Sequence, residues 1–281
     1  MKIYQLKNQS PCQMMGYVIV TNGGKVIVFD GGTADTTELF REIIALQGNH
    51  IDYWFITHPH HDHYSVFKKI SEEPGEITAD AVYYSPMDPE LAASDPNRAG
   101  EINGFNDAIN NTPFTLKTLC LGEIFKIDDL EIEVLGIANP DIKEDVYNNN
   151  SCAFMVTEKY NNDNEFKLLI LGDLAIKGGD KLAAMHGKRL KADMVQMAHH
   201  GQNACEKRVY ELIAPKYTLW PTPDWLWTNT CDPEKPGEGP WKTLIVRGWL
   251  EELGATPITS LEKTAIITVD KGDVSVTYYH K

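Results

Sequence analysis

The amino-acid sequence predicts an α/β fold in which two β-sheets are packed between outer layers of helices. Short apolar strands alternate with amphipathic helices in the first third of the 281-residue chain, and this alternation returns in the second half. Hydrophobic residues make up 42% of the sequence, which is enough to fill the core of an α/β domain of this size. No repeat, low-complexity tract or linker divides the sequence, so we expect one domain spanning residues 1–281.

The first elements follow from apolar runs bounded by turn-forming residues. Thr21-Asn22-Gly23-Gly24 lies between two runs rich in β-branched residues and predicts a β-hairpin. The expected order is strands at 14–20 and 25–29, a helix at 36–46, a strand at 51–57, a helix at 64–71 and a strand at 81–84. Residues 85–113 are rich in Pro, Asp, Asn and Gly, so we expect a long insertion with a weak helical segment at 101–109.

The second half predicts a further series of strands and helices. Strands are expected at 114–121, 123–127, 130–135, 152–157 and 166–171, with a turn at 160–164 joining the last two. They are followed by a helix at 179–185, a strand at 193–198, a helix at 207–213, a strand at 217–220, a helix at 241–253 and a closing hairpin of strands at 263–269 and 274–279.

Net charge and cysteine content argue against several classes of partner and site. Forty acidic and 26 basic residues give a formal net charge of −14, which argues against binding long nucleic acid and leaves a small-molecule substrate. Residues 1–9 lack an apolar signal core, and no run approaches the roughly 20 apolar residues that span a bilayer. The five cysteines include no Cys-x-x-Cys pair, so we expect no disulfide framework, no thiolate zinc site and a cytoplasmic location. The oligomeric state stays open.

The densest chemical signal is the run His58-Pro59-His60-His61-Asp62-His63. Imidazoles and carboxylates are the ligands of hydrolytic divalent-metal sites. His58 and His60 lie two residues apart at the end of a strand, so both side chains leave the same face of an extended backbone. A turn would aim Asp62 and His63 at a neighbouring point. A histidine-rich surface loop is the alternative, but the apolar strand before the run and the helix after it favour metal binding.

Two later strands also end in side chains that bind metals. Gly172-Asp173 follows the apolar run Leu168–Leu171, and His199-His200-Gly201 follows the strand at 193–198. Each could be an ordinary turn. Because ligands of α/β sheets gather where strands end at one edge, the three strand ends reinforce one another.

With these residues, the chain resembles the metallo-β-lactamase fold superfamily. Its motif His-x-His-x-Asp-His is matched by His58, His60, Asp62 and His63. The resemblance implies a four-layer αβ/βα sandwich, with Asp30 bracing the histidine loop, Asp173 bridging two ions and His200, rather than His199, ligating the second. The ions are then most simply zinc, with Mn or Fe possible.

Within the superfamily, the chain most resembles the extracellular-type domain of the competence protein ComEC and its free-standing relatives. Their Asn-Asn-Ser segment is matched by Asn149-Asn150-Ser151, and their late His-His-Gly-Ser motif by residues 199–202, although Gln202 replaces the serine. Phosphorylcholine esterases of the same fold are a second similar group. No histidine lies between His63 and His186, so the mid-chain histidine of many members is absent and the first ion is expected to bind more weakly. Asn149 or Asn150 would either contact water or substrate there or form a turn.

The resemblance implies a hydrolase in which a water shared by two metal ions attacks the substrate. The first ion is expected on His58, His60 and Asp173, and the second on Asp62, His63, Asp173 and His200. Asp62 is expected to be essential for turnover, and His199 to protonate the leaving group or bind substrate. The preferred substrate is a phosphodiester or related ester.

Other functions remain open at this stage. The same fold could hydrolyse a thioester, lactone or amide. A flavin-partnered redox role is disfavoured because His60 stands where such members have a carboxylate. A non-catalytic metal-binding role is disfavoured by the intact motif. The tryptophan-rich loop 220–227 could wall the active site or pack onto the core.

Overall fold

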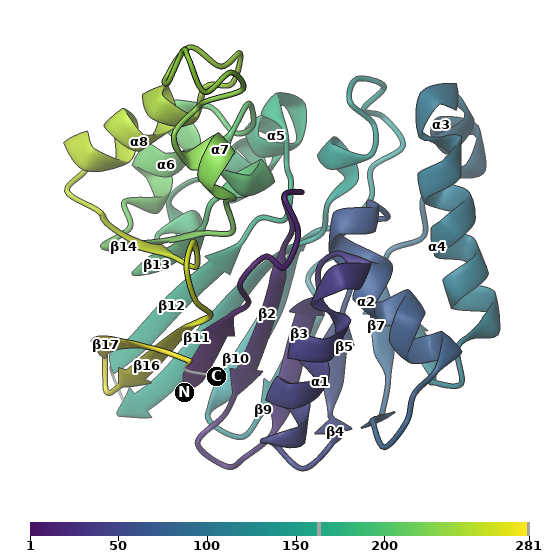
Figure 1. The fold of residues 1–281 in the computed structure, drawn as a ribbon. Coiled ribbons are helices and arrows are strands. Elements are labelled where there is room, and N and C mark those ends of the chain that lie inside the picture. Colours follow the sequence, from purple (N-terminus) through teal and green to yellow (C-terminus); the bar gives the residue numbers. More distant parts are fainter. Residues whose placement is uncertain (162–163, 280–281) are drawn as a thin grey trace.

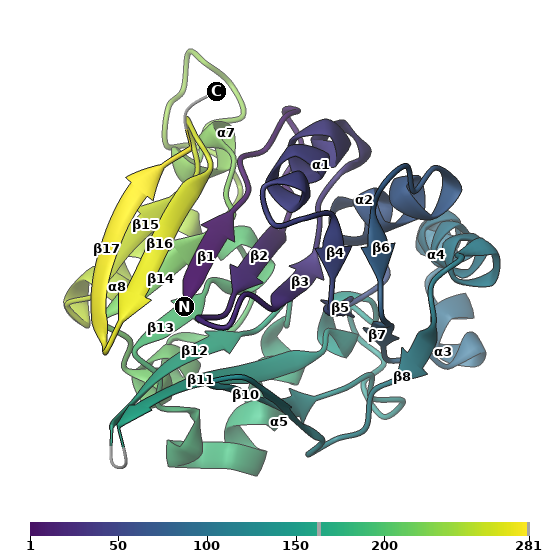
Figure 2. The same ribbon diagram turned by 90° about the horizontal axis from the view of Figure 1, so that it is seen from below.

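Two β-sheets pack face to face, and helices cover the outer face of each (Figures 1 and 2). The computed structural model describes residues 1–161 and 164–279. Each interface between layers has its own apolar cluster. Phe29, Phe55 and Phe154 lie between the sheets, Trp54 packs beneath the first helical layer, and Tyr210 packs beneath the second. These clusters confirm the four-layer arrangement expected from the sequence.

The first sheet has eight strands in the order β17-β16-β1-β2-β3-β5-β7-β8 within the described residues. Its strands, in chain order, are β1 Lys2–Gln5, β2 Gly16–Val20, β3 Val26–Asp30, β5 Tyr53–Phe55, β7 Val82–Tyr84, β8 Leu116–Thr118, β16 Ala265–Asp270 and β17 Asp273–Tyr278. A separate parallel pair joins β4 His50–Ile51 to β6 Thr78–Ala79.

The second sheet has seven strands in the order β15-β14-β13-β12-β11-β10-β9, again counting described residues. The strands are β9 Ile124–Ile127, β10 Leu130–Gly136, β11 Ala153–Asn161, β12 Asn164–Ile170, β13 Met194–Gln196, β14 Tyr217–Trp220 and β15 Thr256–Thr259. Strands β12 to β15 run parallel to one another, so the carboxyl ends of β12 and β13 meet at one edge.

The helices divide between the two outer faces. On the first sheet lie α1 Thr37–Ala45, α2 His61–Glu72 and α4 Ala99–Asn111, and on the second lie α5 Ile176–His186, α6 Lys207–Ile213 and α8 Thr243–Glu252. Shorter helices are α3 Pro89–Ala93 and α7 Asp224–Trp227, with 3₁₀ turns η1 Ala34–Thr36, η2 Pro96–Arg98, η3 Asn148–Asn150, η4 Gly187–Leu190 and η5 Ala198–Gly201. Among the described residues, none of the helices combines the length and the apolar character that a membrane span requires.

The predicted hairpin of the first strands is confirmed by antiparallel pairing of β2 with β3, in which Val20 faces Val26. Both strands are apolar on both faces because one face meets the second sheet and the other meets the helices. The edge strand β17 instead has mostly exposed side chains. Central and edge strands therefore differ in their hydrophobic pattern as their burial demands.

Some element boundaries differ from the sequence prediction. The strand expected at 51–57 is divided at Asp52, because the residues before it pair with β6 and those after it pair with β3 and β7. The helix expected from Tyr64 begins at His61, so the second half of the metal motif is helical. Strands β1 and β15 were not predicted; β15 contains Pro257, which an edge strand tolerates. The predicted turn at 160–164 lies partly outside the described residues.

Candidate metal centre

The motif loop lies at the carboxyl ends of β3 and β5 and is fixed by backbone hydrogen bonds. The amide of Met15 donates to the carbonyl of Asp62 at 3.0 Å, and the amide of Gly32 donates to the carbonyl of His63 at 3.2 Å. Gly32 has φ of 102°, and a side chain there would collide with Met14. The glycine is needed where the chain turns closely beneath the loop.

Asp30 holds this loop from below. Its carboxylate accepts hydrogen bonds from the Thr57 amide, the Thr57 hydroxyl and His63 Nδ1, each at 2.7 Å. The bond to Nδ1 fixes the ring of His63 and turns Nε2 toward Asp173, 3.2 Å from its Oδ2. A carboxylate behind an imidazole is a common way to orient a metal-binding histidine. This is the bracing contact that the resemblance implied.

The three strand ends converge on Asp173. Its Oδ2 atom lies 3.3 Å from His200 Nε2 and 3.8 Å from His58 Nε2. His200 Nε2 also lies 3.2 Å from Asp62 Oδ2. Two groups of buried side chains therefore share Asp173, namely Asp62, His63, Asp173 and His200 in one and His58, His60 and Asp173 in the other. All six of the predicted ligands are brought together.

Several ligand atoms of these groups are buried without a hydrogen-bond partner among the described residues. They are His60 Nε2, His63 Nε2, His200 Nε2 and both carboxylate oxygens of Asp173. The imidazole nitrogens of His63 and His200 lie at ion-pair distance from the Asp173 and Asp62 carboxylates, but these contacts do not have the geometry of hydrogen bonds. Each such atom costs roughly 1–3 kcal/mol if it stays unsatisfied. A set of inward-pointing imidazole nitrogens and carboxylate oxygens fits divalent metal ions, which would satisfy all of them.

Electrostatics divide the histidines into two kinds. Burial lowers the pKa of His60 to about 4 and that of His58 well below its usual value, so both are neutral at pH 7. Burial also opposes protonation of His200, but the carboxylates of Asp173 and Asp62 outweigh it and raise the pKa to about 9. The pKa of His63 is raised in the same way, by Asp173 and Asp30. Without a metal, His63 and His200 therefore carry protons where the proposed cation would bind.

The two adjacent histidines of the third strand end have different positions. Both have left-handed backbone angles, with φ of 49° at His199 and 55° at His200. His200 is fully buried, and its Nδ1 lies 3.0 Å from the carbonyl oxygen of Pro221, so Nε2 points into the cluster. His199 lies at the margin: its Nδ1 is 3.2 Å from the Asn203 carbonyl, and its Nε2 is 3.9 Å from Asp173 Oδ2. The geometry favours His200 as the ligand.

The asparagines near the missing histidine serve the backbone. Asn149 Oδ1 accepts the Gly178 amide at the start of α5, and Nδ2 donates to the Glu144 carbonyl, each at 2.7 Å. Asn150 likewise bonds to the Asn139 amide and the Val146 carbonyl. These bonds favour the turn interpretation over contact with water or substrate. They also fix Ser151, whose hydroxyl oxygen accepts the Asp173 amide at 3.0 Å.

Tyr147 is a site residue that the sequence reasoning missed. Its ring is stacked on His60, with ring centroids 5.5 Å apart and planes 11° apart. Its hydroxyl donates to the carbonyl of Ala92 in α3, so the insertion reaches the metal cluster through this ring. A tyrosine ahead of three asparagines carries no sequence signal for this role.

His61, by contrast, faces away from the cluster and bonds through Nδ1 to Glu101 of α4. Its side chain is 53% exposed. The insertion therefore contacts the motif loop a second time, on its outer side.

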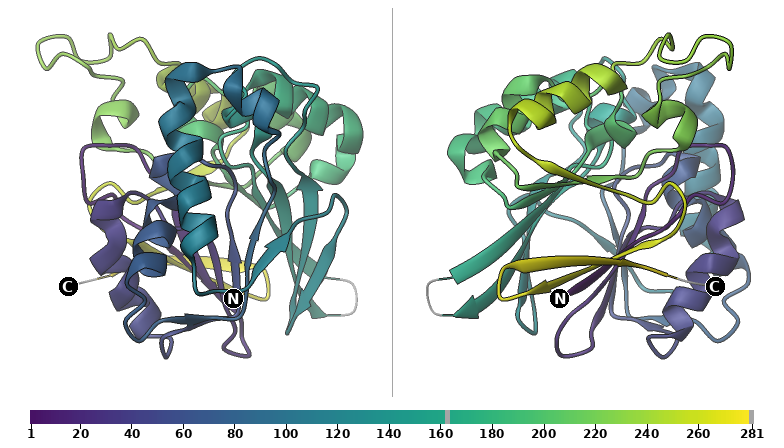
Figure 3. Two further views of the ribbon diagram at one scale, coloured as in Figure 1. Left: turned by 90° about the vertical axis from the view of Figure 1, so that its right-hand side faces the viewer. Right: turned by 60° about the vertical axis from the view of Figure 1, so that its left-hand side comes forward.

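The tryptophan-rich loop packs partly onto the core, as one of its two expected roles requires. Trp220 is buried, Trp227 packs edge-on against it, and Arg247 stacks over Trp227 at 3.8 Å. These contacts fasten the loop to the core. Trp225 and Trp241 instead pair with each other at 4.7 Å and stay partly exposed, where the segment between α7 and α8 extends outward (Figure 3).

Comparisons with known proteins agree with the fold. The model of the metallo-beta-lactamase superfamily matches residues 11–89, which include Asp30 and the motif at 58–63. The metallo-beta-lactamase fold protein YhfI from Bacillus subtilis is similar over 98% of this chain and 98% of its own, with a TM-score of 0.54 and 12% identity. Zn²⁺-bound PqqB from Methylobacterium extorquens is similar over 92% of this chain and 98% of its own, with a TM-score of 0.52 and 12% identity. No curated protein matches the chain in sequence.

The chain thus has the metallo-β-lactamase fold, and its histidine motif lies in the segment that the superfamily model matches. Identities of this size establish the fold alone. The ComEC-like subtype stays a prediction.

Proposed function

We propose that this protein is a metal-dependent hydrolase with a two-metal centre, which cleaves a phosphodiester or a related ester. The observation that carries the proposal is the group of buried, unpartnered nitrogen and oxygen atoms around Asp173. His58, His60 and Asp173 would hold one ion, and Asp62, His63, Asp173 and His200 the other. Zinc is the first choice, since the similarly folded PqqB is described as Zn²⁺-bound, although such donors also accept Mn or Fe.

The charges of the site support an anionic substrate. With neutral imidazoles, Asp62 and Asp173 are the ionised ligands of the proposed set. Two divalent cations would outweigh these two carboxylates and leave a net positive centre, which suits a phosphodiester better than an uncharged ester. When bound, the ions would supply an activated water and polarise the scissile group.

The residues of the chain supply orientation and a proton. Asp30 and the Pro221 carbonyl hold Nδ1 of His63 and His200, which presents both Nε2 atoms to the cluster. His199 donates from Nδ1 to the Asn203 carbonyl, so its Nε2 faces the centre at the less buried margin. In the imidazolium form, His199 can give the Nε2 proton to the leaving oxygen, which departs as an alcohol.

The test combines metal analysis with one matched pair of variants. Purified protein should contain more than one equivalent of Zn, Mn or Fe and hydrolyse bis(p-nitrophenyl) phosphate. Asp62→Asn should lower kcat/KM by about 10³-fold without changing the far-ultraviolet circular dichroism. The control Asp107→Asn makes the same change on the exposed face of α4 and should leave activity intact. Full activity of Asp62→Asn would contradict the mechanism. Turnover of thioesters or lactams in place of diesters would overturn the substrate class and keep the hydrolase.

A further inference from the structure

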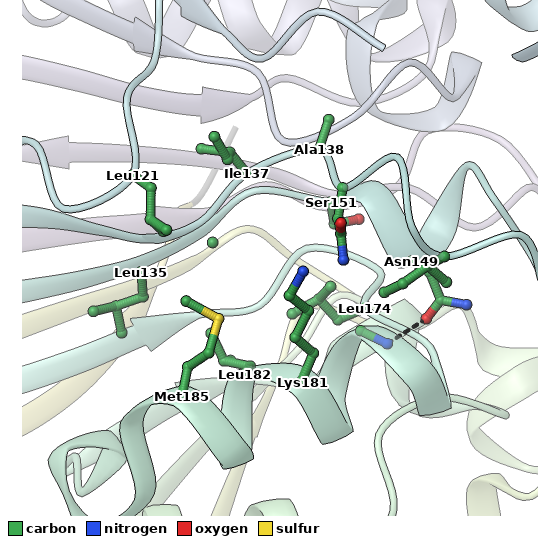
Figure 4. Close-up of a pocket in the computed structure, with 14 residues that line it drawn as sticks. Leu121, Leu135, Ile137, Ala138, Asn149, Ser151, Leu174, Lys181, Leu182 and Met185 are labelled. Carbon is green, nitrogen blue, oxygen red and sulfur yellow. Dashed lines mark hydrogen bonds between the residues drawn. The ribbon is translucent and has the colours of Figure 1, made fainter. Parts of the chain in front are cut away.

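A cavity lies beside the candidate metal centre. It has a volume of about 170 Å³ and lies between the end of β10, the segment that follows it and α5. The residues that Figure 4 labels around it are Leu121, Leu135, Ile137, Ala138, Asn149, Ser151, Leu174, Lys181, Leu182 and Met185. We propose that this cavity binds a small carboxylic acid with an apolar body. None of the proposed metal ligands lines the cavity, so the inference does not depend on the proposed function.

The side chains that line the cavity determine the size and polarity of the apolar part of the ligand. Leucine, isoleucine and methionine side chains form most of it, and Leu121 and Met185 are 48% and 47% exposed at its rim. An apolar cavity of about 150 Å³ in another protein holds benzene, so this volume accommodates a body of about six to eight heavy atoms. Exposed apolar side chains around a concave apolar surface are typical of small-molecule sites.

Two hydrogen-bond donors at the cavity determine the polar group of the ligand. Asn139 Nδ2 is buried and has no partner among the described residues. Lys181 is an exposed residue of α5 whose side chain points toward Ser151 at the cavity (Figure 4), and no ion pair joins it to another described residue. The adjacent Asp180 pairs instead with Arg208. The buried, unpartnered amide donor requires an acceptor, and the ammonium group at the cavity favours an acceptor that carries negative charge.

The other polar groups of the wall are already engaged. Both ends of the Asn149 amide bond to backbone groups, and the Ser151 hydroxyl oxygen accepts the Asp173 amide. The Asn149 amide therefore has little left to offer a ligand, and Ser151 has its hydroxyl hydrogen left to donate. Because the chain carries a net charge of −14, an anion is held only where a cation is local, and Lys181 provides one. A ligand whose carboxylate lies between Asn139 and Lys181 would accept hydrogen bonds from both, and its apolar part would pack against the leucine side chains.

The experiment titrates the purified protein with benzoate and hexanoate and uses benzamide as the uncharged analogue of benzoate, with calorimetry or ligand-observed NMR as the readout. We expect saturable binding of at least one acid. Lys181→Met should weaken that binding by about tenfold or more, because it removes a charge-assisted contact, and should change benzamide binding little. Lys177→Met removes the same charge one turn earlier on α5 from a lysine that does not line the cavity, and should stay within about twofold of the parent.

A metal-centre variant separates this site from direct binding of the acid to metal. His60→Ala should retain acid binding in the cavity. If acid binding is lost in His60→Ala and kept in Lys181→Met, the acid binds the metal centre and the proposal is wrong. Equal weakening by Lys177→Met and Lys181→Met, or no saturable binding of either acid, would also overturn it.

Discussion

The two halves of the candidate metal centre are built with different rigidity. In the half formed by Asp62, His63 and His200, each histidine has its Nδ1 atom held by an oxygen acceptor, from Asp30 or from the Pro221 carbonyl. In the other half, His58 Nδ1 lies 3.1 Å from the Thr57 hydroxyl oxygen. His60 Nδ1, however, lies 3.0 Å from His58 Nε2 instead of an oxygen, and the His60 ring is stacked on Tyr147. A hydrogen-bonded imidazole is oriented before a metal arrives, whereas a stacked ring can still rotate in its plane. We therefore expect the His200 half to bind its ion more tightly.

The largest expected effect comes from deleting one ligand of each half. His200→Ala should lower kcat/KM for bis(p-nitrophenyl) phosphate by about 10³-fold and remove the tightly held ion, whereas His60→Ala should cost about 10- to 100-fold and remove the weaker ion. Metal content of both variants, measured after dialysis against a chelator, checks the order. His50→Ala is a control outside the centre, with a side chain 43% exposed. Identical metal loss in both ligand variants would break the comparison.

The next effect is a difference in pH dependence. The raised pKa of His200, about 9, means that a proton occupies this half at pH 7 and must leave when an ion binds. The affinity of this half should therefore rise with pH up to about 9, by about tenfold per pH unit for each proton released. His58 and His60, whose pKa values are lowered by burial, are already neutral at pH 7, so the other half should change little. Competition with a chelator of known affinity at about pH 6.5 and about pH 8.5 would measure both. If the metal affinity of the His60 half rose more steeply with pH than that of the His200 half, the assignment of the protonated histidines to the His200 half would be wrong.

The smallest effect should come from Tyr147. Replacing it with leucine removes the ring that stacks on His60 and should weaken the ion of that half by about two- to tenfold, with little effect on the other ion. Tyr147→Phe keeps the ring and loses only the bond to the Ala92 carbonyl, so it should bind metal as the parent does. Calorimetric titration of the metal-free protein with zinc resolves the two steps. If phenylalanine weakens binding as much as leucine does, then the hydroxyl, not the stack, positions His60.

The sequence was sufficient where one local pattern determines one structure. The hairpin of β2 and β3 followed from apolar runs around an Asn-Gly turn, and the motif at 58–63 predicted four side chains that the fold brings into one cluster. Asp173 and His200 were harder, since a carboxylate or histidine after a strand is usually part of a turn. They became convincing only as a set, because parallel strands bring their carboxyl ends to one edge.

Other features could not be predicted because they depend on tertiary contacts. Tyr147 and His60, whose rings stack, lie 87 positions apart in the chain (147 − 60 = 87). Strand β1, only four residues long, exists because β2 and β16 flank it on both sides. The choice of His200 over His199 depends on consecutive left-handed residues, a conformation that histidine shows rarely and that no pattern announces.

The unpartnered atoms around Asp173 also bear on how long the protein survives in a cell. A chain that folds around unsatisfied buried groups is less stable without its ions, and an ion that binds only the folded state adds about 4 kcal/mol when its free concentration is 1,000 times its dissociation constant. Under the proposed function, metal shortage would raise the unfolded fraction, and cellular proteases would clear the chain faster. Metal supply would then set the abundance of this protein as well as its activity.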